Sequence, residues 1–124
     1  MKKLALVGCG GIGQYHLGHI LQFGNLVESV GFCDLILERA EKFAAQAGGK
    51  AYTDFWKMLD ETNPDMVFLC VPPTEHGPME RELISRKIPF FVEKPIALNW
   101  DMAKEIADAI EEAGLITAVG FQCR

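Results

Sequence analysis

The sequence lacks the features that mark membrane, zinc-binding and nucleic-acid-binding proteins. No apolar run approaches the ~20 residues that cross a membrane. The four cysteines form no C-x-x-C pair, so the sequence predicts no metal site. The formal net charge of −5 argues against the basic patch that nucleic-acid binding requires. We therefore expect a protein with no metal, no nucleic-acid partner and no membrane attachment.

The composition that remains is that of an ordinary globular domain, with 49% hydrophobic and 23% charged residues. A chain of 124 residues is long enough for one domain with its own core. The cysteines are spread along the chain at Cys9, Cys33, Cys70 and Cys123. We interpret them as buried, reduced thiols, which suits a cytoplasmic location. The apolar run from Leu4 to Val7 is too short for a signal peptide, so we interpret it as a buried strand.

Strand-like and helix-like patterns alternate along the whole chain. Strands are expected over residues 3–7, 27–33, 50–52, 66–71, 89–92 and 115–121. Helices are expected between them, over residues 12–23, 35–47, 55–60, 75–86 and 100–113. This alternation predicts an α/β fold with a doubly wound parallel sheet, the Rossmann fold, with strand order 3-2-1-4-5-6.

A glycine-rich turn follows the first expected strand. It runs from Gly8 to Gly13, and its first, third and sixth residues fit the motif G-x-G-x-x-G. In this motif the first glycine permits a tight turn, the second lets the backbone approach a pyrophosphate, and the third lets helix and strand pack closely. The pyrophosphate meets N–H groups at the positive end of the helix dipole. The predicted dinucleotide-binding residues of the turn are Gly8, Gly10, Gly11, Ile12 and Gly13.

Asp34 stands at the end of the second expected strand, about 20 residues after the last glycine of the motif. An acidic side chain at this position accepts hydrogen bonds from the adenosine ribose hydroxyls. The alternative is that Asp34 only caps the helix that follows. A carboxylate here repels the 2′-phosphate of NADP, and residues 35–37 contain no cation; Arg39 is the nearest. The sequence therefore favours NAD over NADP.

Three other expected strands also end in chemically distinctive residues. Open parallel sheets bind ligands beyond the carboxyl ends of their strands. The fourth strand ends at Val71 and a P-P-x-x-H loop follows, and the sixth ends in G-F-Q-x-R. After the fifth come Glu93, Lys94 and Pro95. A lysine whose surroundings bring its pKa near neutral pH can exchange a proton with an alcohol. The alternative is a surface ion pair between Glu93 and Lys94.

With these motifs the chain resembles the Gfo/Idh/MocA family of oxidoreductases over its whole length, as that family's N-terminal domain. The resemblance implies that Lys94 is catalytic, acting on the substrate hydroxyl, and also contacts the cofactor. It implies that Glu93 binds the nicotinamide ribose and that Gln122 lies near the nicotinamide. Further cofactor-binding residues are Val71, Pro72, Thr74 and His76. For His76 the alternative is a cap of the following helix.

The resemblance implies an oxidoreductase that transfers a hydride between NAD and a hydroxyl carbon of a sugar, cyclitol or similar polyol. It also implies a C-terminal substrate domain absent from residues 1–124, and a homo-oligomeric full-length enzyme. We expect these residues, as a single dinucleotide-binding domain, to bind NAD without turning over a substrate. One alternative is a stand-alone NAD-binding sensor or non-catalytic subunit. Another is an S-adenosylmethionine-dependent methyltransferase, which the spacing from Gly8 to Gly13 and the Lys94 motif count against.

Overall fold

The computed structural model describes residues 2–71, 78–93, 100–115 and 117–120. The chain divides into two compact units, Met1–Cys70 and Val71–Arg124. The first unit carries the glycine-rich turn and Asp34, and the second carries Val71 and Glu93.

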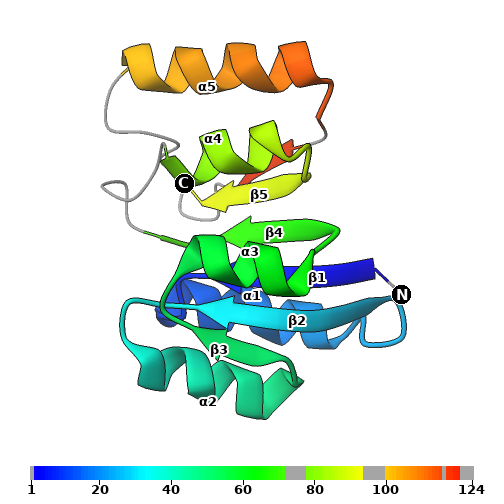
Figure 1. Cartoon of the computed structure of the whole chain (residues 1–124). Helices are drawn as coiled ribbons and strands as arrows, with labels where there is room; N and C mark the ends of the chain where they lie inside the picture. The colour runs from blue at the N-terminus through cyan, green and yellow to red at the C-terminus, as the bar shows by residue number, and fades with distance from the viewer. Residues whose placement is uncertain (1, 72–77, 94–99, 116, 121–124) are drawn as a thin grey trace. The chain divides into compact units, whose positions relative to one another are not determined.

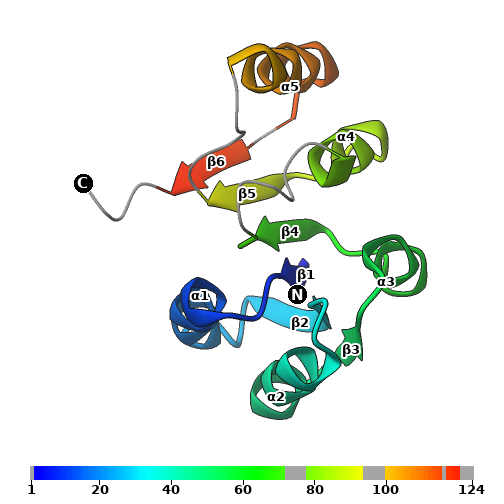
Figure 2. The same ribbon diagram turned by 90° about the vertical axis from the view of Figure 1, so that its left-hand side faces the viewer.

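Four parallel strands and three helices form the first unit (Figure 1). The strands, in the spatial order β3-β2-β1-β4, are β1 (Lys2–Val7), β2 (Val27–Cys33), β3 (Lys50–Tyr52) and β4 (Met66–Leu69). The helices are α1 (Gly11–Leu21), α2 (Leu37–Ala47) and α3 (Phe55–Thr62). Figure 2 shows α1 and α2 on one side of these strands and α3 on the other.

The core of the first unit is built around β1. Residues Leu4 to Val7 are at most 2% exposed, because helices cover both faces of the strand. On one face, Leu17 and Ile20 of α1 pack with Phe32 and with Phe43 of α2. Burial on both faces fixes β1 in the middle of the unit, so the turn that follows it is held from both sides.

The second unit contains two strands and two helices. They are α4 (Pro78–Ser85), β5 (Phe90–Glu93), α5 (Trp100–Ala113) and β6 (Thr117–Gly120). β5 and β6 are parallel neighbours, with Phe90 opposite Thr117. α4 and α5 lie side by side, and Arg81 forms an ion pair with Glu105 at 3.0 Å across them (Figure 1). The spatial orders within the two units are those of the corresponding parts of the expected 3-2-1-4-5-6 sheet.

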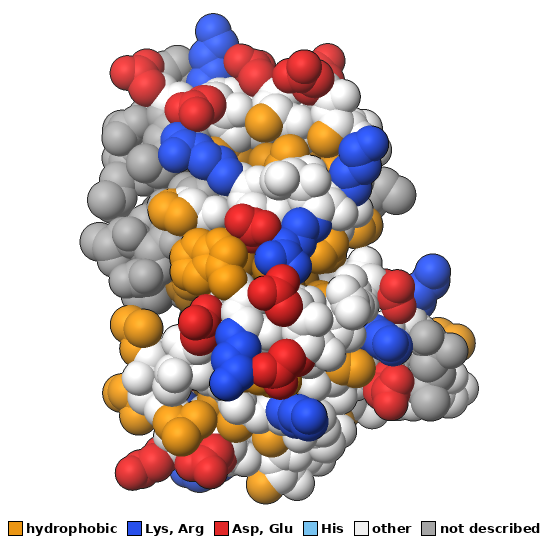
Figure 3. All heavy atoms as spheres, viewed as in Figure 1, with side chains coloured by type: hydrophobic (Ala, Val, Ile, Leu, Met, Phe, Trp, Pro, Cys, Tyr) orange, Lys and Arg blue, Asp and Glu red, His pale blue; other side chains and the backbone are white. Residues whose placement is uncertain are grey.

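On the face shown in Figure 3, acidic and basic groups of the described residues are interspersed over most of the surface, and acidic groups predominate along its top edge. Among the described residues, no helix is both long enough and apolar enough to span a membrane.

Candidate functional site

The glycine-rich turn connects the buried end of β1 to the start of α1. Gly8 has a φ of 92°, a conformation that side chains with a Cβ rarely adopt. Its backbone N–H donates to the carbonyl oxygen of Cys33 at 2.8 Å, which ties the start of the turn to the end of β2. The first glycine of the motif therefore occupies the tight turn that the sequence predicts for it.

The other glycines of the turn differ in what surrounds them. A Cβ on Gly13 would overlap the carbonyl oxygen of Gly8 and come within 3.3 Å of the Phe43 ring. Helix and strand thus approach too closely here for any side chain. A Cβ on Gly10 or Gly11 would meet no atom within 4 Å. The turn is therefore packed on its inner side and open on its outer side, where a phosphate group would approach the backbone.

The start of α1 suits an anion. Gly10 is the N-cap and offers no side-chain hydrogen bond to the helix, and the first turn contains no acidic residue. The first N–H groups of a helix have no partner within the helix, and they lie at its positive end. Together with the open side of the turn, these groups fit the pyrophosphate of a dinucleotide.

Asp34 lies directly beside the turn. Its Oδ2 accepts a hydrogen bond from the Cys9 N–H at 2.7 Å, and its Oδ1 accepts one from the Ile36 N–H at 2.8 Å. Its own N–H donates to the Tyr52 carbonyl oxygen at 3.0 Å. The N-cap of α2 is Ile36, not Asp34. The structure therefore brings together two features that are separate in the sequence, the glycine motif and this half-buried carboxylate.

The residues that follow Asp34 are apolar and exposed. Leu35 is 79% exposed and Ile36 is 48% exposed. Arg39 lies further on, in the first turns of α2, and is exposed. The first residues of the chain after the carboxylate thus offer hydrocarbon rather than a positive charge to a ligand beside Asp34.

Two cysteine thiols lie under the turn in neutral form. Cys9 and Cys33 are each 4% exposed, and the Cys9 thiol donates to the Cys33 carbonyl oxygen at 3.6 Å. Burial, together with the nearby negative charge of Asp34, raises the pKa of both thiols to about 12. Both are therefore protonated near neutral pH and serve as packing groups. Cys70 is a reduced thiol as well, and it is half-buried.

The two histidines of α1 contact nearby aromatic rings and backbone. The His16 ring packs edge-on against Phe68 with centroids 5.9 Å apart and against Tyr15 at 5.4 Å. His19 Nδ1 lies 3.1 Å from the Tyr15 carbonyl oxygen, one helical turn earlier. Within the described ranges, no group of three or more metal-binding side chains is assembled.

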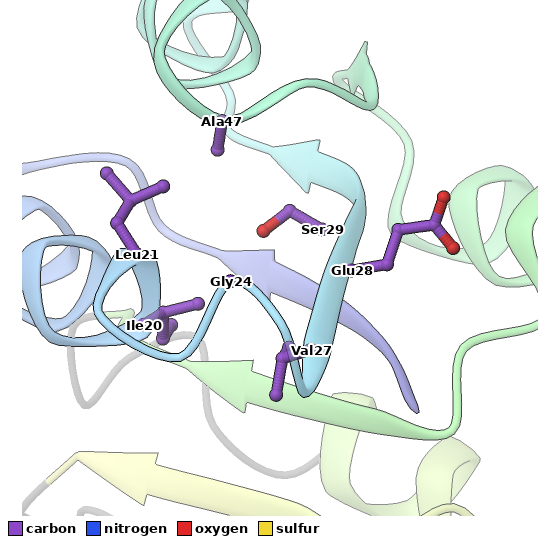
Figure 4. Close-up of a pocket in the computed structure, with 7 residues that line it drawn as sticks. All are labelled: Ile20, Leu21, Gly24, Val27, Glu28, Ser29 and Ala47. Atoms are coloured by element: carbon purple, nitrogen blue, oxygen red, sulfur yellow. The ribbon is translucent and has the colours of Figure 1, made fainter. Parts of the chain in front are cut away.

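A cavity of about 180 Å³ lies at the opposite end of β2 from Asp34 (Figure 4). It is lined by Val27, Glu28 and Ser29 of β2, by Ile20, Leu21 and Gly24 near the end of α1, and by Ala47 of α2. Parallel sheets bind ligands at the carboxyl ends of their strands, whereas these β2 residues begin the strand. This cavity is therefore not the candidate cofactor site.

The remaining predicted site residues are only partly described. Val71 is described and half-buried, and Glu93 ends β5 opposite Gly120. Outside the described residues lie Pro72, Thr74, His76, Lys94 and Gln122. The roles assigned to all of these residues stay predictions.

Comparison with known proteins identifies similar sequences over nearly the whole chain. A family model described as the Gfo/Idh/MocA oxidoreductase family, NAD-binding Rossmann fold, matches residues 2–121. A scyllo-inositol 2-dehydrogenase (NAD(+)) from Bacillus subtilis is 28% identical, covering 98% of this chain and 36% of the relative. A glucose-6-phosphate 3-dehydrogenase from the same organism is 26% identical, covering 100% of this chain and 35% of the relative.

The fold of this chain is also similar to that of a solved structure. The WlbA dehydrogenase from Bordetella pertussis, in complex with NADH and UDP-GlcNAcA, has a TM-score of 0.87 and 31% identity. The match covers 95% of this chain and 36% of that protein. The predicted Rossmann fold is thereby confirmed. The chain spans about a third of the length of these relatives.

Proposed function

Because this chain belongs to the Gfo/Idh/MocA oxidoreductase family, as its NAD-binding Rossmann domain, we propose that it is part of an enzyme that oxidises a polyol or reduces the corresponding carbonyl compound. The reaction transfers a hydride between NAD and a hydroxyl carbon of a sugar, cyclitol or similar compound. One observation carries the cofactor-binding part of the proposal: Asp34 lies hydrogen-bonded beside a glycine turn that is open on its outer side. The names of the two Bacillus relatives, an inositol and a glucose-6-phosphate dehydrogenase, support this substrate class.

The described residues would hold the adenosine diphosphate half of the cofactor. Gly10 and Gly11 leave space for the pyrophosphate against the backbone, and the N–H groups that begin α1 would donate to its oxygens. Asp34 would accept hydrogen bonds from the ribose hydroxyls. The exposed Leu35 and Ile36 would place hydrocarbon, not a cation, near the ribose, which favours NAD over NADP. When bound, NAD supplies the hydride acceptor or donor.

Lys94 would accept the hydroxyl proton of the substrate. As the carbinol C–H bond breaks and the hydride leaves, the hydroxyl proton would pass to the Lys94 amine and the C=O bond would form. Glu93 would bind the nicotinamide ribose, and Gln122 would lie near the nicotinamide. Val71, Pro72, Thr74 and His76 would line the cofactor. These roles follow from the family resemblance.

The alternative function is a stand-alone NAD sensor or a non-catalytic subunit. A sensor needs the turn and Asp34 but has no use for a proton-transferring lysine. In a full-length protein that oxidises a polyol, Lys94→Ala should abolish turnover and leave NAD affinity nearly unchanged. An unchanged rate would show that Lys94 does not take the proton, whereas a full-length protein that binds NAD and turns over no polyol would favour the sensor.

Cofactor preference tests the binding part of this proposal. Isothermal titration of the chain should show NAD binding at least ~10-fold more tightly than NADP, equivalent to about 1.4 kcal/mol. Asp34→Ala should narrow that ratio, because it removes the repulsion of the 2′-phosphate. Equal or reversed affinities in the unmodified chain would contradict the assignment of NAD, and binding of neither cofactor would contradict the proposed function.

A further inference from the structure

Three bonds pin the beginning of the glycine turn to the end of β2. The Gly8 N–H donates to the Cys33 carbonyl oxygen at 2.8 Å, and the Cys9 thiol donates to the same oxygen at 3.6 Å. The Cys9 N–H donates to Asp34 Oδ2 at 2.7 Å. Only the last of these bonds has a charged acceptor, which makes it the strongest of the three. The carboxylate predicted to bind ribose is thus also part of the turn's own support.

The carboxylate can do both tasks at once. An ionised carboxylate has about four acceptor positions on its two oxygens. The N–H groups of Cys9 and Ile36 each use one, on Oδ2 and Oδ1 respectively. One position on each oxygen therefore remains for a ligand hydroxyl. Ribose binding does not require Asp34 to release the turn.

The bond at Cys9 acts directly on the phosphate-binding part of the turn. Cys9 is the residue before Gly10, whose open side faces the space that a pyrophosphate would enter. The Cys9 side chain is buried among the core residues below the turn, so a shift of its backbone would disturb that packing. Holding the Cys9 N–H therefore fixes the position from which the Gly10 and Gly11 backbone meets a phosphate.

We propose that Asp34 is a positioning residue for the pyrophosphate turn, acting through the Cys9 N–H, in addition to its ribose contact. The inference rests on the proposed NAD-binding function. It makes pyrophosphate binding depend on Asp34 even when the ligand has no ribose hydroxyls. Charge alone predicts the opposite, because removing a carboxylate beside the turn weakens its repulsion of an anion. Weaker binding of such a ligand after loss of the carboxylate therefore supports the positioning role, and stronger binding supports charge repulsion alone.

Two nucleotides that differ only in their ribose hydroxyls provide the test. ADP and 2′,3′-dideoxyadenosine diphosphate are titrated calorimetrically into the chain and into Asp34→Asn. The amide of this variant keeps the shape of the carboxylate, but its single oxygen serves only one of the two backbone N–H groups. In either orientation the Cys9 N–H loses its charged acceptor. We expect Asp34→Asn to weaken both nucleotides, the dideoxy compound by about tenfold.

Asp65→Asn is the matched control. Asp65 Oδ2 accepts the Lys3 N–H at 2.7 Å, the same distance as at Cys9, but near the opposite end of β1. Like Asp34→Asn, this variant replaces a charged acceptor of a backbone N–H by a neutral one, and it should leave both nucleotide affinities unchanged. Weakening of equal size in the two variants would mean general destabilisation and would overturn the positioning role.

The possible outcomes separate the inference from the function beneath it. If Asp34→Asn weakens ADP yet leaves or strengthens dideoxy-ADP binding, Asp34 acts through ribose alone and the inference is wrong, while NAD binding stands. If the unmodified chain binds neither nucleotide, the proposed function itself fails.

Hydrogen exchange of the Cys9 amide tests for its bond to Asp34 in the absence of any ligand. In the unmodified chain this amide should be protected, and Asp34→Asn should speed its exchange while Asp65→Asn does not. Should Asp34→Asn fail to fold, the unmodified chain decides alone: a protected Cys9 amide supports the positioning role, and rapid exchange overturns it.

Discussion

Gly13 shows how the absence of one carbon atom sets the distance between α1 and β1. A Cβ at this position would overlap the Gly8 carbonyl oxygen, which is backbone and cannot rotate away. The position was predictable because its residue type is part of the motif. The bond between Cys9 and Asp34 was not predictable, since Cys9 occupies a motif position open to any residue and donates through its backbone. A contact made by a backbone N–H leaves no sign in the residue type.

Alanine substitutions of two glycines in α1 should have opposite effects on stability. Gly13→Ala should lower the free energy of unfolding by about 3 kcal/mol, because the new Cβ pushes helix and strand apart. Gly18 lies in the same helix, exposed, and a Cβ there meets nothing within 4 Å. Gly18→Ala should therefore raise the free energy of unfolding by about 0.5–1 kcal/mol. Urea denaturation of both variants measures the changes; equal effects would refute the packing argument.

At the scale of single elements, the sequence predicts segments whose limits are set by local signals. The bounds of β2, β3 and α5 are those expected. The helix α2 ends at Ala47 as expected, and Gly48 follows it with a φ of 86°. Limits that depend on tertiary partners were wrong. The strand expected over residues 66–71 ends at Leu69, because its neighbour β1 ends at Val7 where the turn begins.

The start of α2 shows the same effect of tertiary structure. The helical pattern predicted residues 35–47, yet the helix begins at Leu37. The Ile36 N–H donates to the side chain of Asp34, two residues earlier, so the chain turns there instead of coiling. Asp34 is held in that position by the Cys9 N–H, which lies 25 residues away in sequence. A pattern read over neighbouring residues cannot register such a contact.

The cap of α3 offers a test at this scale, because Thr53 and Asp54 both precede the helix and both are residue types that cap helix N-termini. In the structure Asp54 is the N-cap, and its Oδ1 accepts the Lys57 N–H at 3.1 Å. Asp54→Ala should lower the free energy of unfolding by about 1 kcal/mol, whereas Thr53→Ala, at an exposed position, should change it little. Chemical denaturation followed by circular dichroism checks both. A larger loss for Thr53→Ala would mean that the cap is misassigned.

For the molecule as a whole, the resemblance of the sequence motifs already indicated the family, and the comparison with solved structures confirms the fold. The adenosine side of the candidate site is assembled within the first unit, from the turn and Asp34. The catalytic side rests on Lys94, Glu93 and Gln122, whose roles stay predictions. The chain spans about a third of the length of its dehydrogenase relatives, so binding and catalysis need not reside in the same stretch of sequence.

This division leads to a prediction for the 124-residue chain: it binds NAD but turns over no polyol. The glycine turn and Asp34 supply contacts for the pyrophosphate and ribose. Catalysis requires in addition that the substrate carbon be held against the nicotinamide in near-attack geometry and that water be excluded. Without those conditions a solvated lysine keeps too high a pKa to accept the alcohol proton near neutral pH.

The measurement is NADH absorbance during incubation of the chain with NAD and a panel of inositols and sugars. The Bacillus scyllo-inositol 2-dehydrogenase, assayed with scyllo-inositol, serves as the positive control for the assay. Calorimetric titration on the same preparation establishes that NAD is bound, so that an absence of turnover reflects chemistry and not an empty site. Sustained NADH production by the chain, abolished by Lys94→Ala, would show that a complete catalytic site lies within these 124 residues and would refute the prediction.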